Sequence, residues 1–289
     1  MKKKKLYLVF CLLSFITGIH AQSTQEEYFR SMLEGNPIKV TLWENGVPNS
    51  NGMEGDKNMP ELSIYLPKAD KPTKAVVICP GGSYAVLAIH HEGTLWRDLF
   101  MNEGIAAIVL AYRLPYGHTE VPASDVYEAI RTVKAHAEEW NIDPDKIGIM
   151  GASAGGHLAS TVATHASDDV RPAFQILLYP VISMDDRYTH KDSKKNLLGE
   201  NPTEELIKLY SNELQVTSKT PKAILLLADD DDVVNPLNST LYYEALKAHD
   251  VPASLYIYPT GGHGFGILDT FAYKTEMVLN LKSWLRSLE

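Results

Sequence analysis

Cysteine is scarce in this chain of 289 residues, which contains only Cys11 and Cys79. Cys11 lies in the apolar run 6–15, which follows four lysines and leads to Ala21. This arrangement is typical of a secretory signal peptide, here residues 1–21, that is cleaved after Ala21. We therefore expect an exported protein, periplasmic or secreted. Because Cys79 would then be its only cysteine, no internal disulfide could form and the hydrophobic core alone would stabilise the fold.

Positive charge is also in short supply, with 27 Lys and Arg against 36 Asp and Glu and a formal net charge of −9. The predicted signal peptide holds four of the lysines and no acidic residue, so its removal makes the chain more acidic still. Such a protein repels polyanions, which argues against nucleic acid or an anionic membrane surface as a partner. The apolar run of the signal is too short to span a bilayer, so we expect no stable membrane insertion.

Linkers, repeats and low-complexity segments are absent from the sequence, and residues 22–289 are expected to form a single domain. Continuous apolar runs, typical of strands covered on both faces, alternate with stretches of helical periodicity. This alternation predicts an α/β fold with a mostly parallel central sheet flanked by helices. The predicted strands are 61–66, expected at an edge, and 75–79, 105–112, 146–150, 174–179, 223–227 and 254–258. The predicted helices include 239–248, 271–288 and one that starts at Ser124.

Residues 184–221 interrupt this alternation, because the stretch is polar and contains one predicted helix, at about residues 203–214. Insertions that follow the carboxyl end of a strand lie above the crevice in which such sheets bind ligands. We expect residues 184–221 to form a small lid or pocket wall. A solvated excursion without a chemical role is the alternative.

Residues 151–155 have the G-x-S-x-G pattern, with Ser153 at the centre, between a predicted strand and a stretch of helical character. In this setting the serine occupies a sharp strand-to-helix turn, and the flanking glycines let strand and helix approach closely. The N-terminus of the helix also favours negative charge beside the serine. Ser153 is therefore the predicted nucleophile. The alternative is a chance pentapeptide in a chain with 19 glycines.

A serine nucleophile needs a base that is itself oriented by a carboxylate, and in doubly wound hydrolases the acid and then the base follow the serine. His263 stands in a glycine-rich loop after the last predicted strand and is the predicted base rather than an ordinary turn histidine. The acid is expected among the four aspartates 229–232. Asp231 is preferred because it stands three residues before Val234 in a D-x-x-V pattern, and Asp230 is the alternative. The run lacks the alternating ligands of a calcium loop.

The developing oxyanion needs N–H donors, one from the residue after the nucleophile and others from the loop after an earlier strand. Ala154 would supply the first, and Gly82 and Ser83 the others; the alternative is that Pro80-Gly81-Gly82 only ends a strand. This chemistry requires no metal or cofactor. His157 is expected to pack against the sheet rather than transfer a proton. His90-His91-Glu92 resembles a metal-binding pair only superficially, because adjacent residues point apart on regular elements.

Six sequence blocks span nearly the whole chain after the predicted signal. They are LWENGVP at 42–48, ICPGGSY at 78–84, HEG at 91–93, AYRL at 111–114, GIMGASAGGHL at 148–158 and GGHGFG at 261–266. Together they resemble the secreted carbohydrate esterases of polysaccharide-degrading bacteria, the acetylxylan-esterase-like group. The resemblance implies an α/β-hydrolase fold with Ser153, Asp231 and His263 as nucleophile, acid and base. Two positions depart from the pattern, since Ser83 replaces a glycine and Asn235 stands where proline is more common.

The predicted function is an exported serine esterase that removes acyl groups, in the first place acetyl, from plant cell-wall polysaccharide such as xylan. Acylated oligo- or polysaccharide is then the expected partner. A peptidase of the prolyl oligopeptidase type is one alternative, although such enzymes normally carry a propeller domain for which this chain has no room. A catalytically silent sugar-binding relative of the hydrolases is the other. Acetyl or feruloyl preference, the polysaccharide and the oligomeric state stay open.

Overall fold

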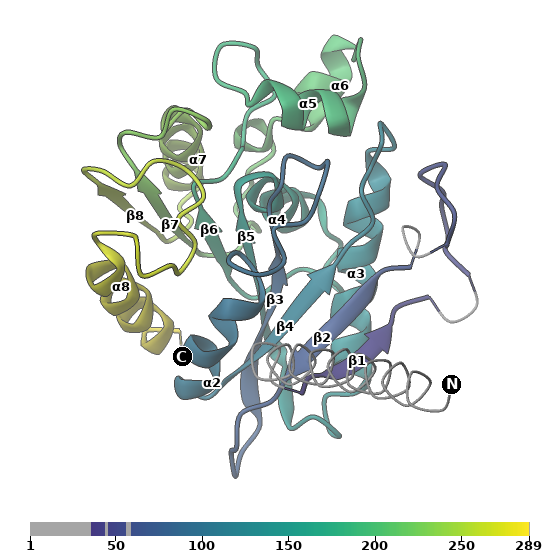
Figure 1. Ribbon diagram of the computed structural model, residues 1–289, viewed down its shortest axis with the longest axis vertical. Coiled ribbons are helices and arrows are strands. Elements are labelled where there is room, and N and C mark those ends of the chain that lie inside the picture. Colours follow the sequence, from purple (N-terminus) through teal and green to yellow (C-terminus); the bar gives the residue numbers. More distant parts are fainter. Residues whose placement is uncertain (1–35, 44–45, 56–58, 289) are drawn as a thin grey trace, which may run out of the picture. The chain divides into compact units, whose positions relative to one another are not determined.

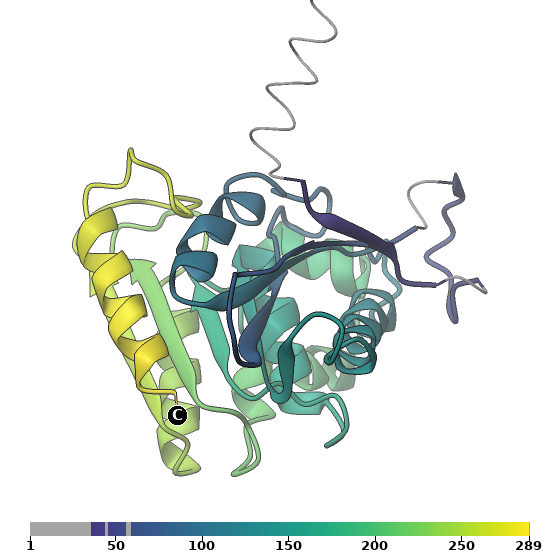
Figure 2. The ribbon, with the colours of Figure 1, turned by 90° about the horizontal axis from the view of Figure 1, so that it is seen from below.

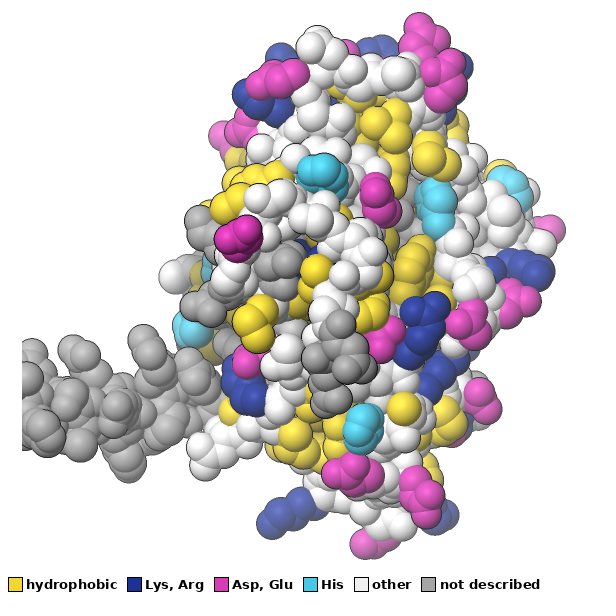
Figure 3. Space-filling model, turned by 90° about the vertical axis from the view of Figure 1, so that its right-hand side faces the viewer, with side chains coloured by type: hydrophobic (Ala, Val, Ile, Leu, Met, Phe, Trp, Pro, Cys, Tyr) yellow, Lys and Arg dark blue, Asp and Glu magenta, His cyan; other side chains and the backbone are white. Residues whose placement is uncertain are grey.

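The computed structural model describes residues 36–43, 46–55 and 59–288, so the predicted signal peptide lies outside the described residues. Ile38–Glu289 cluster as one compact unit. Among the described residues, no helix combines the length and the apolar character that crossing a membrane requires. On the face shown in Figure 3, the described acidic and basic side chains are intermixed, and this face offers no extended cationic surface for a polyanion.

The fold is built on an eight-stranded sheet with the order β1-β2-β4-β3-β5-β6-β7-β8. The pairs β1–β2 and β2–β4 are antiparallel, and every other neighbouring pair is parallel. The prediction of a mostly parallel central sheet is therefore confirmed. The strands are β1 (Ile38–Thr41), β2 (Glu61–Tyr65), β3 (Thr73–Cys79), β4 (Ile105–Ala111), β5 (Ile142–Ala152), β6 (Gln175–Leu178), β7 (Ala223–Ala228) and β8 (Ala253–Tyr258).

Each central strand contains an apolar run because it buries side chains on both faces of the sheet. In β3, Ala75, Val77 and Cys79 belong to one core cluster, whereas Val76 and Ile78 belong to the other. Successive side chains of a strand point to opposite faces, so a sheet with two covered faces requires an unbroken apolar run. The two clusters are the hydrophobic cores above and below the sheet.

Helices cover both faces, as the two core clusters and Figure 2 show. Buried side chains of α3, α4 and α7 belong to one cluster, and those of α2 and α8 belong to the other. Helical layers on both sides of a parallel sheet follow from its crossover connections. The helices are α2 (Arg97–Asn102), α3 (Glu120–Ala135), α4 (Ser153–His165), α5 (Lys191–Leu198), α6 (Glu204–Leu209), α7 (Leu237–Ala248) and α8 (Lys274–Arg286), with 3₁₀ turns η2 (Thr94–Trp96) and η3 (Asn212–Leu214).

Two expectations for single elements are wrong. Residues 61–66 were expected at an edge, but β2 lies between β1 and β4, and the edge strand is β1. No residue of β1 is buried, so its sequence shows no apolar run. Helix α3 starts at Glu120 and not at Ser124. Pro122 is tolerated in its first turn, because the N–H that proline lacks has no intrahelical acceptor there.

The insertion 184–221 contains more structure than the single helix expected at about 203–214. It forms α5, α6 and η3, and α6 ends at Leu209. Figure 1 shows α5 and α6 at the top of the view, beyond the sheet and above α4. In open parallel sheets ligands bind outside the carboxyl ends of the strands. The loops that follow β3, β7 and β8 and the first turn of α4, which directly follows β5, carry all of the predicted site residues at this edge.

Candidate active site

The turn between β5 and α4 places Ser153 in a strained backbone conformation, with φ of +53°. Left-handed backbone costs a non-glycine residue of order 1 kcal/mol and is maintained only by the surrounding structure. The neighbouring glycines provide that structure, because a Cβ on Gly151 would lie 2.0 Å from the Gly155 carbonyl oxygen. A Cβ on Gly155 would lie 2.0 Å from the Cys79 carbonyl oxygen. The G-x-S-x-G spacing thus lets α4 start directly against the ends of β3 and β5.

Ser153, His263 and Asp231 form a continuous chain of two hydrogen bonds. Ser153 Oγ lies 2.8 Å from His263 Nε2, and His263 Nδ1 lies 2.7 Å from Asp231 Oδ2. With its Nδ1–H donating to the carboxylate, the neutral imidazole presents Nε2 as the acceptor of the serine proton. The Asp231 side chain is 1% exposed and that of His263 is 15% exposed. The structure therefore brings together three side chains that are far apart in the sequence.

The two candidate aspartates have different partners. The Asp231 Oδ1 atom accepts hydrogen bonds from the N–H groups of Val233 and Val234, at 3.0 and 2.9 Å. Asp230 is exposed, and its Oδ1 atom accepts the Gly262 N–H at 2.8 Å. Asp231 therefore contacts the imidazole, whereas Asp230 holds the loop that carries it. No group of three His, Cys, Asp or Glu side chains within the described ranges is arranged to bind a metal ion.

The loop after β3 has three consecutive residues with positive φ, namely Gly82, Ser83 and Tyr84, at +120°, +58° and +59°. A Cβ on Gly82 would lie 2.3 Å from the Val86 carbonyl oxygen, so only glycine fits there. Within the described part of the chain, the Gly82 and Ser83 N–H groups donate to no backbone carbonyl. The Ala154 N–H, in the first turn of α4, has no intrahelical acceptor. All three predicted donors are thus available to a ligand, and their role in binding an oxyanion stays a prediction.

His157 is buried and connects three parts of the molecule. The Tyr84 hydroxyl lies 2.9 Å from Nδ1, and Nε2 lies 2.8 Å from the Tyr210 carbonyl oxygen. Desolvation by burial lowers the pKa of His157 to about 4, so the ring is neutral at pH 7, donates through Nε2–H and accepts through Nδ1. We expected this residue to pack against the sheet, and it is buried, but its hydrogen-bond and ring partners are Tyr84 of the loop after β3 and Tyr210 of the insertion.

The insertion reaches the oxyanion loop through Asn196 of α5. Its Nδ2 donates to the Ser83 carbonyl at 2.8 Å, and its own carbonyl accepts the Gly117 N–H at 2.9 Å. His190, just before α5, is half-buried, and burial lowers its pKa, with smaller electrostatic effects from Asp192, His263 and Asp231. These contacts place the insertion beside the site. Its action as a lid or pocket wall stays a prediction.

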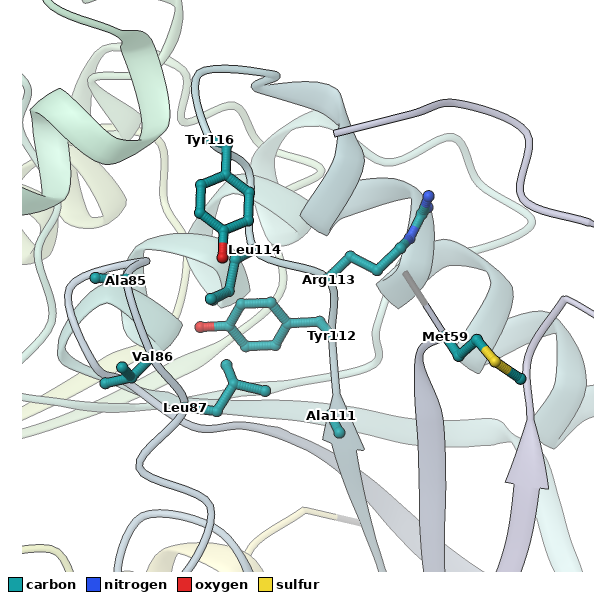
Figure 4. Close-up of a pocket in the computed structure, with 9 residues that line it drawn as sticks. All are labelled: Met59, Ala85, Val86, Leu87, Ala111, Tyr112, Arg113, Leu114 and Tyr116. Atoms are coloured by element: carbon teal, nitrogen blue, oxygen red, sulfur yellow. The ribbon is translucent and has the colours of Figure 1, made fainter. Parts of the chain in front are cut away.

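A cavity of about 370 Å³ lies next to the oxyanion loop (Figure 4). One wall is formed by residues 85–87 of that loop, and the opposite wall by the chain after β4, including Tyr112 and Tyr116. The Tyr112 hydroxyl donates to the Pro80 carbonyl at 2.7 Å, which fixes this wall to the end of β3. Tyr116 is 46% exposed and Val86 is 63% exposed. Exposed apolar side chains around a hollow are typical of ligand-binding surfaces.

Two residues of this region were not predicted from the sequence. Tyr179 directly follows β6, and its ring lies 4.7 Å from that of His263 in an edge-on arrangement. Glu92 is 3% exposed and accepts hydrogen bonds from the Gly81 N–H and the Tyr179 hydroxyl. The sequence offered two weak signals, the position of Tyr179 at the carboxyl end of a central strand and the place of Glu92 in the HEG block at 91–93.

Comparison with known proteins places the chain in a family. The BD-FAE family profile matches residues 62–246. The chain is 41% identical, over 237 residues, to an acetylxylan esterase of Xylanibacter ruminicola, and the match covers 81% of this chain and 49% of that protein. It is 34% identical to endo-1,4-beta-xylanase B of Butyrivibrio fibrisolvens, with 84% of this chain and 41% of that protein covered. The chain therefore spans about half or less of the length of these curated relatives.

Solved structures show the same architecture. An acetyl ester-xyloside bifunctional hydrolase from Caldicellulosiruptor lactoaceticus superimposes with a TM-score of 0.80 at 38% identity, and covers 88% of this chain and 97% of its own. A carboxylesterase from Lactobacillus plantarum, 20% identical with a TM-score of 0.69, shares the fold. The resemblance drawn from the six sequence blocks is confirmed by these matches. The chain belongs to the BD-FAE family and has the α/β-hydrolase fold.

Proposed function

We propose that this chain is a serine esterase that hydrolyses acyl esters, acetyl in the first place, on plant cell-wall polysaccharide such as xylan. The observation that carries the proposal is the pair of short hydrogen bonds that joins Ser153, His263 and Asp231. The relatives named an acetylxylan esterase and a xylanase support the acetyl group and the polysaccharide. With residues 1–21 acting as a signal peptide, the enzyme would work outside the cytoplasm.

In the acylation step, Ser153 Oγ attacks the ester carbonyl carbon while its proton passes to His263 Nε2. Asp231 fixes the imidazole tautomer and stabilises the imidazolium. The negative charge on the former carbonyl oxygen is bound by the N–H groups of Ala154, Gly82 and Ser83. Collapse of the tetrahedral intermediate breaks the bond to the sugar oxygen, which takes the proton from His263 and leaves as a hydroxyl.

In the deacylation step, His263 removes a proton from water, and the resulting hydroxide attacks the acyl-Ser153 carbonyl. The second tetrahedral intermediate is bound by the same N–H groups. Its collapse returns the proton from His263 to Ser153 Oγ and releases the carboxylic acid. In each half-reaction His263 thus accepts one proton and donates it again, so the imidazole is neutral at the end of both steps.

Product analysis on native acetylated and feruloylated hemicellulose tests this proposal. We expect release of acetate, and replacement of Ser153 by alanine should lower kcat roughly 10⁶-fold. Ser167→Ala, an exposed serine outside the site, is the control and should keep full activity. Stoichiometric labelling of Ser153 by a fluorophosphonate is expected as well. A folded protein that is neither labelled nor releases any acid would contradict an esterase and would favour a silent sugar-binding protein.

A prolyl amide substrate separates the esterase from a peptidase of the prolyl oligopeptidase type. The esterase should hydrolyse 4-nitrophenyl acetate and leave the amide intact. Turnover of the amide at a comparable kcat/KM would reverse this assignment.

A further inference from the structure

Glu92 is a buried carboxylate close to the site that the reaction above does not use. Its side chain is 3% exposed, and each of its two oxygens accepts one hydrogen bond, Oε2 from the Gly81 N–H at 2.8 Å and Oε1 from the Tyr179 hydroxyl at 2.9 Å. Within the described ranges its single ion-pair contact is His91, whose Nε2 lies 4.0 Å from Oε1. Burying a carboxylate costs several kcal/mol, so such a group is retained where its contacts are needed.

The Tyr179 contact leads to the imidazole. Burial and the neighbouring Glu92 raise the pKa of Tyr179 well above its ordinary value, so the hydroxyl stays protonated and donates to the carboxylate. The same hydroxyl accepts the Gly266 N–H at 2.9 Å, in the loop that carries His263. The Tyr179 ring packs edge-on against His263 and, at 4.6 Å, against Phe265. Glu92 therefore fixes, through Tyr179, the loop on which the imidazole stands.

The Gly81 contact leads to the nucleophile and to the predicted oxyanion donors. A Cβ on Gly81 would lie 2.5 Å from Glu92 Oε2 and 2.9 Å from Ser153 Cβ. The carboxylate and the serine side chain thus both pack against the Gly81 Cα, and there is no room for a larger residue. Because Gly81 precedes Gly82, the hydrogen bond to Oε2 also fixes the start of the segment that supplies the oxyanion donors.

We propose that Glu92 is a positioning residue for acyl transfer. One carboxylate holds the oxyanion loop with one oxygen and, through Tyr179, the His263 loop with the other, so that both loops keep a fixed position relative to Ser153. The transition state needs the imidazole and the oxyanion donors aligned at the same moment, and small displacements of such groups are costly to the rate. This inference rests on the proposed esterase function and adds a residue to it.

The variant Glu92→Gln tests the proposal, because an amide has one acceptor oxygen where the carboxylate has two. If that oxygen accepts the Gly81 N–H, the Tyr179 hydroxyl proton loses its acceptor. If it faces Tyr179, two donors meet at Gly81. With 4-nitrophenyl acetate we expect kcat to fall about 30-fold while KM changes by less than about twofold. The matched control is Glu103→Gln, which removes a carboxylate paired with Arg286 and should leave kcat unchanged.

Tyr179→Phe is the second variant and keeps the Gly81 contact while breaking the other one. We expect kcat to fall about tenfold. In the double variant, the fold-loss of kcat should be at most about twice the loss in Glu92→Gln alone, because the two residues act in one network. The rate of Ser153 labelling by a fluorophosphonate should fall in the same order. A residue with a purely structural role would lower the melting temperature and leave kcat of the folded protein unchanged.

Wild-type kcat in folded Glu92→Gln, or a loss confined to KM, would overturn the proposal. If Glu92→Gln does not fold, Tyr179→Phe decides, and a change in kcat below about twofold would reject it. The wild-type enzyme separates this inference from the proposed function. Labelling and turnover by the wild type with unaffected variants refute the positioning role alone, whereas an unlabelled, inactive wild type refutes the esterase.

Discussion

At the scale of single residues, backbone N–H groups hold the carboxylate of the site in place. Asp231 uses one oxygen for the N–H groups of Val233 and Val234 and the other for His263. Val234 is itself buried, at 2% exposure, and anchors the turn. A carboxylate that accepts several N–H bonds has few orientations available, so it can fix the imidazole tautomer.

The two neighbouring aspartates should therefore differ sharply when they are neutralised. Asp231→Asn places an amide against His263 Nδ1 and favours the wrong tautomer, and we expect kcat to fall about 10⁴-fold. Asp230→Asn leaves the imidazole contact intact and should lower kcat less than about tenfold. Steady-state kinetics with 4-nitrophenyl acetate on both folded variants measures the difference. Equal losses would show that the site does not distinguish the two carboxylates.

The residues of this site differ in how well they can be predicted from the sequence. Ser153, His263 and Asp231 could be predicted because each follows a strand within a short pattern, and strand ends converge at one edge of a parallel sheet. Glu92 stands in the HEG block, but its role could not be predicted, because its partners Gly81 and Tyr179 are 11 and 87 positions away and no local pattern connects them. Contacts that form only on folding leave no local signature of this kind.

At the scale of elements, β5, α4 and the end of β3 can meet only because residue 155 is a glycine and has no side chain. A Cβ on Gly155 would meet the carbonyl oxygens of Cys79 and Pro80 at 2.0 and 2.5 Å. These are backbone atoms, which cannot rotate away as a side chain would. The first turn of α4, which carries Ser153, can therefore approach β3 only with glycine at this position.

Gly155→Ala should lower the free energy of unfolding by about 3 kcal/mol, because α4 has to move away from β3. Gly104→Ala is a matched control, since Gly104 has φ of +70° with nothing within 4 Å of its Cβ position. In that variant the alanine adds only backbone strain, so the free energy of unfolding should fall by about 1 kcal/mol. Urea unfolding of both variants gives the comparison. If both variants lose a similar free energy of unfolding, the structure accommodates the Cβ at residue 155 without an additional energetic penalty.

Most of the strands could be predicted from apolar runs, because a segment buried on both faces has no polar position to interrupt its pattern, as in residues 75–79 of β3 and in β7. The exceptions have physical reasons. The sequence of β1 carries no burial signal, and its pairing places β2 inside the sheet. In the insertion, α6 has no buried residue, and two of the four buried residues of α5, Ser193 and Lys194, are polar. Neither helix therefore shows a clear apolar stripe in the sequence.

At the scale of the whole molecule, His157 joins α4 to the oxyanion loop and to the insertion. Tyr84, Tyr210 and the imidazole are linked by hydrogen bonds and stacked or edge-on ring contacts. The ring fits this place only when it is neutral, because both of its nitrogens have fixed roles. Protonation of one residue should therefore weaken the packing of three segments together.

The stability of the protein should depend on pH through this histidine. In the unfolded chain its pKa is close to 6.5, and in the folded protein it is about 4. Between these two pH values the unfolded state binds a proton that the folded state does not. The contribution of His157 to the free energy of unfolding is therefore fully present above pH 6.5 and decreases as the pH is lowered toward 4, by about 3 kcal/mol in total. The variant His157→Gln cannot titrate and isolates this contribution.

The measurement compares the free energies of unfolding of wild type and His157→Gln at pH 7 and pH 4. Acidic residues destabilise both proteins alike as they titrate, so their contribution cancels in the difference. We expect the advantage of the wild type to shrink by about 3 kcal/mol over this interval. A difference that stays constant with pH would mean that His157 titrates normally in the folded protein.

The loop of residues 82–84 makes the site sensitive to chain length more than to side-chain identity. Its proposed donors belong to the main chain, so a point mutation can delete them only by introducing proline. The N–H groups of Ala85 and Val86 close the loop on the Gly82 carbonyl at 2.9 and 3.1 Å. Ser83 can then be replaced by residues that tolerate a left-handed backbone, in the first place glycine and asparagine. An insertion or deletion between residues 82 and 86 would remove the closing turn. Libraries built to alter this protein should vary Ser83, keep Gly82 and preserve the number of residues in the loop.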